Sequence, residues 1–208
     1  MKKKILSLAM IAMLAAVSVS GTLAYYTAKG QAHNVITTGG VDIRLVEKTE
    51  VVGDDGTKTL VDFPEEGIGG VMPGTSVSKI VSVKNDGSAN AWIRMKVEME
   101  ITDNSGNAMP MEIDLKDTAE VETIPIMSVS VDDEKWIYDG EYYYYCKSVS
   151  PEHSTDPLFE EVMFAKEMGN EYQNCTTNII ISAQAVQVTN NPIPDGGDVR
   201  DITGWPKE

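Results

Sequence analysis

The chain has 208 residues, of which 42% are hydrophobic and 24% are charged, and these values are ordinary for one globular domain. Its 32 acidic and 17 basic residues give a net charge of -15, which argues against a nucleic-acid-binding protein because phosphate neutralisation requires clustered Lys and Arg. Two cysteines and two histidines exclude a disulfide-dense mini-fold, a cysteine-rich zinc module and a metal site built from histidines alone.

The N-terminus has the pattern of a secretion signal, with three lysines before an uncharged apolar run over residues 5–19. Thr22 and Ala24 are the small residues beside an expected cleavage, which gives a signal peptide over residues 1–24 and a mature protein starting at Tyr25. An uncleaved anchor helix is the alternative, since about 20 apolar residues span a bilayer. With cleavage the net charge falls from -15 to -18, and the protein is secreted, either extracellular or associated with the cell surface.

Strand patterns dominate from residue 35 onward. Alternating apolar and polar residues predict strands over residues 41–45, 77–83 and 92–101. Polar and glycine-containing turns separate them, with a left-handed glycine expected at Gly87. In the clearest strand one face is the expected core face and consists of Ile93, Met95, Val97, Met99 and Ile101.

The pair Asp139-Gly140 lies between two aromatic runs and predicts a hairpin with a two-residue turn. That register places Trp136 opposite Tyr143 as an aromatic cross-strand contact. The tyrosines at 142–145 fit either a carbohydrate-stacking platform or aromatics on both faces of a sandwich, and we favour the second interpretation.

The last third of the chain leaves several alternatives open. Residues 158–168 fit a strand or a short helix, and the strand expected at 179–188 changes its apolar face near Ala185, which predicts a bulge. Cys146 and Cys175 either pair, closing a loop of about 30 residues worth roughly 3 kcal/mol, or remain two buried thiols.

These patterns predict an all-β protein, an antiparallel two-sheet jelly-roll-like sandwich. We expect the sandwich domain to cover residues 39–190, preceded by an N-terminal extension at 25–38. Residues 191–208 are rich in Pro, Gly and Asp and are expected to form a poorly ordered tail.

Five short motifs occur in an order typical of one family. They are Gly21-Thr22-Leu23-Ala24-Tyr25-Tyr26-Thr27, Gly40-Val41-Asp42-Ile43, Met72-Pro73-Gly74-Thr75, Val81-Ser82-Val83-Lys84-Asn85-Asp86-Gly87-Ser88 and Ala183-Gln184-Ala185-Val186-Gln187. In this order they resemble the TasA/camelysin family of Gram-positive bacteria, whose signal peptides are cut by a SipW-type peptidase. The resemblance covers the signal, the first half of the sandwich and its last strand, while residues 103–174 carry none of these motifs.

The resemblance implies an exported jelly-roll protein that forms fibres of a biofilm matrix or coats cells or spores. In that family the mature N-terminal segment completes the sheet of the next subunit, and here residues 25–38 are the candidate donor, with Tyr25, Tyr26, Val35 and Ile36 as its bulky anchors. The implied partners are further copies of the chain in filaments and an anchoring or accessory matrix protein. We expect that removing residues 25–38 leaves a folded sandwich, because the donor carries little of the internal core.

Catalytic chemistry finds little support in the sequence. The common zinc peptidases use a His-Glu-x-x-His helix, whereas His33 and His153 are isolated, and no Gly-x-Ser-x-Gly elbow is present. We therefore expect a protein that is not an enzyme and has no catalytic residue, cofactor or metal ligand.

Calcium is a weaker candidate, since residues 103–107, 132–134 and 195–198 place several side-chain oxygens close together. The twelfth position of the first loop is Asp114 rather than a bidentate glutamate, and solvated turns are the favoured interpretation.

The leading hypothesis is a secreted structural subunit of a matrix fibre or surface coat. A camelysin-like secreted metalloprotease and a monomeric module that binds cell-surface glycans through its tyrosine-rich hairpin are the alternatives.

Overall fold

The computed structural model describes residues 26–38, 40–115 and 122–206, with side chains described from residue 40 onward. The cleavage residues Thr22, Ala24 and Tyr25 lie outside the described residues. About 49% of the chain is in strands, and the helical segments described are short 3-10 turns. No described helix has the length and apolar character needed to cross a membrane.

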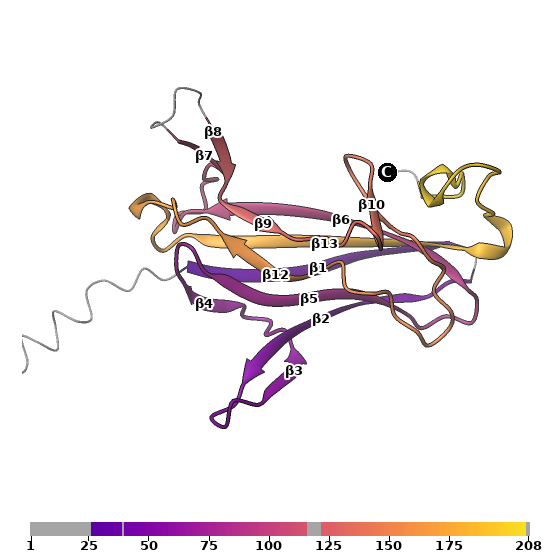
Figure 1. The fold of residues 1–208 in the computed structure, drawn as a ribbon, viewed down its shortest axis with the longest axis horizontal. Helices are drawn as coiled ribbons and strands as arrows, with labels where there is room; N and C mark the ends of the chain where they lie inside the picture. Colours follow the sequence, from indigo (N-terminus) through magenta and orange to yellow (C-terminus); the bar gives the residue numbers. More distant parts are fainter. Residues whose placement is uncertain (1–25, 39, 116–121, 207–208) are drawn as a thin grey trace, which may run out of the picture.

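In the described part of the chain, thirteen strands form three sheets (Figure 1). The first half of the chain contributes β1 (Tyr26–Thr38), β2 (Ile43–Val52), β3 (Lys58–Asp62), β4 (Ile68–Val71), β5 (Ser76–Asn85) and β6 (Ala91–Thr102). The second half contributes β7 (Glu112–Leu115), β8 (Glu122–Pro125), β9 (Met127–Val129), β10 (Trp136–Tyr138), β11 (Tyr143–Tyr145), β12 (Phe159–Phe164) and β13 (Thr176–Gln187). The 3-10 turns are η1 (Asn170–Tyr172), η2 (Val188–Asn190) and η3 (Val199–Asp201).

The body consists of two packed sheets, and two hairpins project from it. The six-stranded sheet has the order β10-β11-β6-β13-β1-β4, and the five-stranded sheet has the order β3-β2-β5-β12-β9. All of these neighbours pair antiparallel except β1 and β13, which run parallel. The small β7–β8 sheet and the end of the β2–β3 hairpin leave the body on opposite sides (Figure 1).

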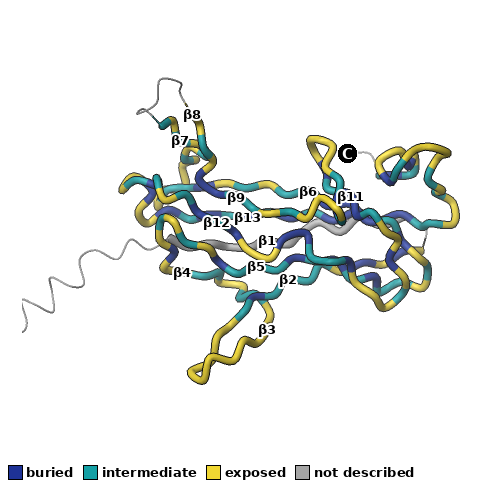
Figure 2. The backbone as a smooth tube through the Cα atoms, viewed as in Figure 1, coloured by how far each residue is buried: buried dark blue, intermediate teal, exposed yellow. Residues whose placement is uncertain are grey.

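The core lies between the two sheets, as the alternation predicts. Ile93, Met95 and Ile101 of β6 are buried, and Val97 and Met99 pack against the same cluster, so the predicted core face is confirmed. β13, which lies beside β6, and β5 and β12 of the facing sheet contribute further buried residues to the same layer (Figure 2). The all-β prediction and the two packed, mainly antiparallel sheets are therefore confirmed.

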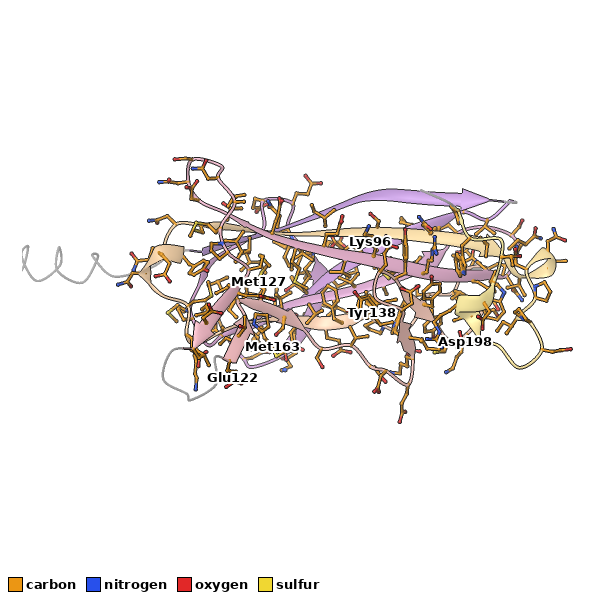
Figure 3. All side chains as sticks on the ribbon, turned by 90° about the horizontal axis from the view of Figure 1, so that it is seen from above. Lys96, Glu122, Met127, Tyr138, Met163 and Asp198 are labelled. Carbon is orange, nitrogen blue, oxygen red and sulfur yellow. The ribbon has the colours of Figure 1, made fainter. Side chains whose placement is uncertain are left out.

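The C-terminal segment is ordered as far as Pro206, which corrects the expected poorly ordered tail. Val199, Ile202 and Trp205 pack against Tyr142 and Tyr144 in a second apolar cluster on the outer side of the six-stranded sheet. Asp198 marks this end of the body, with Glu122 and Met127 toward the other (Figure 3). Since β1 also belongs to the same sheet, the folded body extends beyond the predicted range 39–190 at both ends.

This tail also explains why β13 buries both of its faces near its end. β13 pairs with β6 without interruption, so the predicted bulge near Ala185 is wrong. Val186 points to the outer side of the sheet and is buried there among Val199, Ile202 and Trp205. The apolar pattern changes face because a second layer covers the sheet at that point.

The tyrosine hairpin has a longer loop than the two-residue turn predicted. Trp136 pairs with Tyr145, and Tyr138 with Tyr143, so the register is shifted by two residues. The Asp139 carboxylate accepts hydrogen bonds from the backbone N–H of Glu141 and Tyr142 and stabilises the four-residue loop. The aromatic contact is therefore Trp136–Tyr145, with ring centroids 5.0 Å apart, rather than Trp136–Tyr143.

Gly87 has a different role from the left-handed turn residue expected, because its φ is not positive. A Cβ at Gly87 would lie 2.7 Å from the backbone N of Asp42, so only glycine fits beside the backbone that leads into β2. The neighbouring Asn85 side chain is fully buried and donates to the carbonyl oxygens of Ala89 and Val149. Asn85 thereby connects the end of β5 with the segments that contain Ala89 and Val149.

Both cysteines are free, so the candidate disulfide is not formed. Cys175 directly precedes β13, where Thr176 pairs with Thr102 at the end of β6. Cys146 follows β11, which pairs with β6 at Arg94, on the order of 25 Å along the strand from that end. A disulfide requires Cα atoms within about 7 Å. The strand alternative for residues 158–168 is realised as β12.

Candidate assembly site

The N-terminal strand β1 lies between β13 and β4 in the six-stranded sheet. Its backbone pairs with β13 from Thr27–Thr176 to Thr38–Val186, and its first residues pair with β4 on the other side. Of the candidate donor anchors, Tyr26 pairs with Val71, Val35 with Ala183, and Ile36 with Gln184. Tyr25 lies outside the described residues.

The two strands beside β1 depend on it to different degrees. β13 is also paired along its whole length with β6, from Thr176–Thr102 to Gln187–Ala91, so its position does not require β1. β4 has β1 as its single partner in the sheet order. Departure of β1 would therefore leave the N–H and C=O groups of β13 unpaired along a long edge, which is a binding site for an extended strand.

The core-facing residues of β13 form the apolar floor beside this edge. Ile179, Ile181, Ala183 and Ala185 are all buried to 1% exposure or less. A strand that takes the place of β1 thus finds a preformed apolar surface as well as backbone partners.

The pairing of β1 with β13 contains one irregularity. Ala32 pairs with Ile181 and Asn34 with Ser182, so His33 is an extra residue in the β1 backbone. Such a bulge adds one residue to one strand, while the residues on either side of it remain paired with the partner strand. His33 is this additional residue of β1.

The segment after β4 forms a turn at Met72-Pro73-Gly74-Thr75, one of the five motifs in the sequence. Gly74 has φ +74° and its N–H donates to the Phe164 carbonyl, and the Thr75 hydroxyl donates to the Met72 carbonyl over 2.6 Å. This turn connects the end of β4 to β12.

The internal position of β1 corrects one expectation from the sequence. Residues 26–38 form an integral strand of the subunit's own sheet, with β13 on one side and β4 on part of the other. Removing them would open the sheet, so an intact sandwich is not the expected outcome of that truncation.

The remaining candidate catalytic and calcium residues have local structural roles. His153 is exposed, and its Nδ1 lies 2.9 Å from the Pro151 carbonyl oxygen. The Asp103 carboxylate accepts hydrogen bonds from the Asn107 amide and from the backbone of Asn107 and Ser105, which lower its pKa. Among the described residues no group of three His, Cys, Asp or Glu side chains is placed to hold a metal ion.

The other two acidic turns, at residues 132–134 and 195–198, also have carboxylates that bind groups within the same turn. Asp132 accepts a hydrogen bond from the Glu134 backbone and pairs with Lys135 over 3.1 Å. Asp198 caps η3 and pairs with Arg200 over 2.6 Å. These carboxylates are occupied by partners within their own turns.

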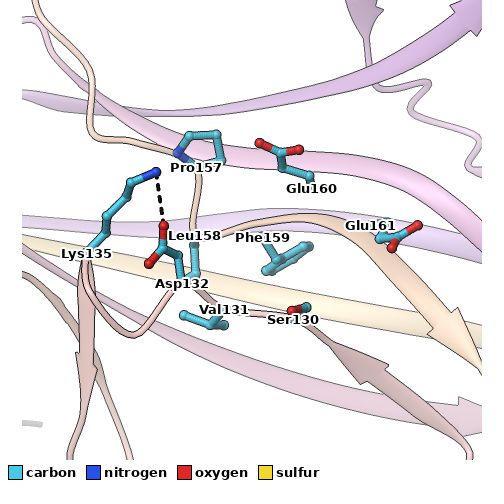
Figure 4. A pocket seen from close by; sticks show the side chains of 9 residues that line it. All are labelled: Ser130, Val131, Asp132, Lys135, Pro157, Leu158, Phe159, Glu160 and Glu161. Atoms are coloured by element: carbon cyan, nitrogen blue, oxygen red, sulfur yellow. Dashed lines mark ion pairs between the residues drawn. The ribbon is translucent and has the colours of Figure 1, made fainter.

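A shallow pocket of about 300 Å³ lies where residues 130–135 meet the start of β12 (Figure 4). The Asp132–Lys135 ion pair forms one wall, and Glu160 and Glu161 form the opposite rim (Figure 4). Val131 and Phe159 contribute apolar surface. No histidine or cysteine is among the residues that line this pocket.

The tyrosine hairpin presents less aromatic surface than its sequence suggests. Tyr142, Tyr144 and Tyr145 are buried, which leaves Tyr138, 52% exposed, stacked on Tyr143 with ring centroids 4.5 Å apart. Burial raises the pKa of Tyr143, Tyr144 and Tyr145. The run is used mainly for packing.

Sequence reasoning missed the role of Arg94, whose side chain is buried on the outer face of β6. Its guanidinium lies 3.8 Å from the centroid of the Tyr142 ring and 5.0 Å from that of Trp205, and it donates to the carbonyl oxygen of Pro206. It also donates to the side chains of Gln184 and Tyr144. The burial of Arg94 could not be predicted from the sequence, because the residues that surround it come from three distant segments.

Comparison of the chain with protein-family models, curated proteins and solved structures finds no match.

Proposed function

We propose that the chain is a secreted, non-catalytic structural subunit of an extracellular fibre or of a cell or spore surface coat. Its sandwich would have a jelly-roll topology, as in the TasA/camelysin family that its motifs resemble. Subunits would assemble by strand donation, each mature N-terminal segment leaving its own sheet to complete that of the next subunit. A SipW-type peptidase would release the segment at Tyr25.

One observation carries the proposal. β1 is the first strand of the described residues and pairs parallel with β13, so the neighbouring subunit can supply the same residues in the same direction. An exchange of this kind conserves every backbone hydrogen bond, because the incoming strand replaces the departing one. Repeated head to tail, such a contact does not close on itself and produces a filament.

A pair of engineered cysteines tests the exchange directly. Val35 and Ala183 are paired in β1 and β13, so Val35→Cys with Ala183→Cys is placed for a disulfide in a background in which Cys146 and Cys175 are replaced by serine. Strand donation predicts a ladder of covalent oligomers on a non-reducing gel after oxidation of the assembled protein. Crosslinked monomers alone, from a sample that contains filaments in the electron microscope, would contradict it.

Two controls complete the experiment. The single variant Val35→Cys should give no ladder, since Ala183 then offers no thiol. Oxidation before assembly should close the disulfide within each subunit and prevent filament growth, because the donor can no longer leave.

Proteolysis assays of the same material with and without zinc, using casein, test the metalloprotease alternative, and we expect no cleavage.

A further inference from the structure

The projecting β2–β3 hairpin carries the largest concentration of exposed apolar residues on the described surface. Val51, Val52, Leu60 and Val61 are 40–60% exposed, and every residue of β3 is exposed (Figure 2). β3 is also the terminal strand of the five-stranded sheet. A projecting ribbon with an open edge and branched apolar side chains has the properties of a strand-pairing surface.

The backbone shows which groups face outward from this edge. Phe63 N–H donates to the Glu47 carbonyl, and Gly53 N–H to the Thr57 carbonyl, so alternate residues of β3 bond to β2. By this alternation Thr59 and Val61 direct their N–H and C=O groups toward β2. Lys58, Leu60 and Asp62 direct theirs away from the hairpin.

The sequence of β3, Lys58-Thr59-Leu60-Val61-Asp62, is complementary to itself when two copies run antiparallel. With Leu60 opposite Leu60 of a second copy, Lys58 lies opposite Asp62 and Thr59 opposite Val61. In this register the outward-facing N–H and C=O groups of Lys58, Leu60 and Asp62 form hydrogen bonds with those of the second copy. We propose that β3 binds β3 of a second copy of this chain in this register, about a twofold axis at Leu60.

Charge selects this register over its alternatives. Antiparallel pairing centred on Leu60 gives two oppositely charged cross-strand contacts, Lys58 with Asp62 in each direction. A parallel arrangement would bring Lys58 near Lys58 and Asp62 near Asp62, which is unfavourable. Charged residues at the ends of an edge strand ordinarily oppose pairing, and here they oppose the parallel arrangement while favouring the self-complementary antiparallel one.

The side chains of the combined four-stranded ribbon also fit together. Glu50 and Leu60 share one face, and Lys58 on that face pairs with Glu50 over 2.8 Å. The other face carries Val51 beside Thr59, and Thr59 would lie next to Val61 of the second copy. Rows of β-branched residues on neighbouring strands are favourable in sheets.

This contact is independent of strand donation. It uses the outer edge of the five-stranded sheet, whereas β1 belongs to the six-stranded sheet. A twofold contact closes at two copies, whereas strand donation is open-ended. The dimer would therefore exist whether or not filaments form, and between filaments it would join them sideways.

The test is sedimentation equilibrium of residues 25–208, which include every described strand, with two charge variants. In Lys58→Glu both cross-strand contacts become acid against acid, and in Asp62→Lys both become lysine against lysine. We expect the unaltered chain to reach a mass of two copies and each variant alone to dimerise at least about tenfold more weakly. Mixed in equal amounts, the two variants should regain the dimer, since each acid of one variant then lies opposite a lysine of the other.

A backbone variant keeps the test independent of charge. Leu60→Pro removes an outward N–H donor without removing a bond to β2, so the hairpin should remain while the dimer is lost. Leu60→Thr, which retains that N–H, is the matched control and should still dimerise. A monomer at all concentrations for the unaltered chain, an unchanged dimer in all variants, or no recovery in the mixture would each overturn the proposal.

Discussion

Lys79 places its ammonium nitrogen 2.6 Å from Glu47 Oε1 inside the sandwich, where the lysine side chain is 2% exposed. The ammonium also lies 3.9 Å from the centre of the Phe63 ring. Burial lowers the pKa of Lys79, and the hydrogen bond to Glu47 opposes that shift. The Lys79–Glu47 pair lies at the boundary of the core, where the β2–β3 hairpin leaves the body.

We expect Glu47→Ala to destabilise the protein by about 3–5 kcal/mol, because it leaves a buried ammonium without its carboxylate. Lys79→Met with Glu47→Leu should be neutral or stabilising, since neither charge then needs desolvation. Urea unfolding followed by circular dichroism measures both. Lys84→Met, which removes a more exposed ion-pair residue, is the control and should change the free energy of unfolding by no more than about 1 kcal/mol. A small effect of Glu47→Ala would show that water reaches the pair.

The tail should contribute measurably to stability. Trp205 packs on Tyr144 with ring centroids 5.6 Å apart and covers the Arg94 guanidinium. Trp205→Ala removes this cover and should cost about 3 kcal/mol. Asp195→Asn, at an exposed position of the same segment, should have almost no effect. Equal stability of the two variants in urea would mean that the tail does not stay docked in solution.

Acid should unfold the protein from below about pH 4, the ordinary range of an aspartate. The side chains of Lys84, Asn107 and Arg200 lower the pKa values of Asp86, Asp103 and Asp198. Partial burial alone would raise the pKa of Asp139, but hydrogen bonds from Tyr142, Glu141 and Tyr144 lower it.

The folded state therefore binds fewer protons than the unfolded state, and the stability present above the unfolded pKa is lost as pH falls through the lower folded values. Thermal unfolding midpoints between pH 7 and pH 2 measure this. Asp139→Asn should flatten the acid part of the curve, whereas a curve unchanged by this substitution would contradict the role of its carboxylate.

Salt should promote assembly. The mature chain starting at Tyr25 has a net charge of -18, and its self-repulsion opposes association. Raising ionic strength from 0.01 M to 0.15 M shortens the screening length from about 30 Å to about 8 Å. Partial neutralisation near pH 5 should act in the same direction, at a pH where the lowered aspartate pKa values still maintain the fold.

Sedimentation of the mature protein across salt and pH checks this expectation. Val35→Pro, which removes a backbone donor in the middle of β1, should stay in the supernatant under all conditions. If both proteins sediment alike, or if neither does at any salt or pH, assembly through the N-terminal strand is wrong. The protein would then be better described as a monomeric surface module.

The core face of β6 was predictable because a half-buried strand has apolar residues at alternate positions, and these identify its buried face. The same rule places Lys79 with Val77, Val81 and Val83 on the core side of β5, so the buried lysine was visible in the sequence as a charge at an apolar position. The hairpin register was not predictable from Asp139-Gly140 alone, because the Asp139 carboxylate stabilises a longer loop through contacts with Glu141 and Tyr142.

By itself the sequence determined the strands, their buried faces, the acidic charge and the motifs that lead to the proposed export. These properties depend on neighbours within a few residues, where the period of the backbone is fixed. Only the tertiary structure decided that the tail docks on Arg94, that Cys146 and Cys175 lie far apart, and that β1 pairs with β13. Each of these depends on surfaces assembled from distant segments, whose meeting is set by packing across the whole sheet and leaves no local pattern.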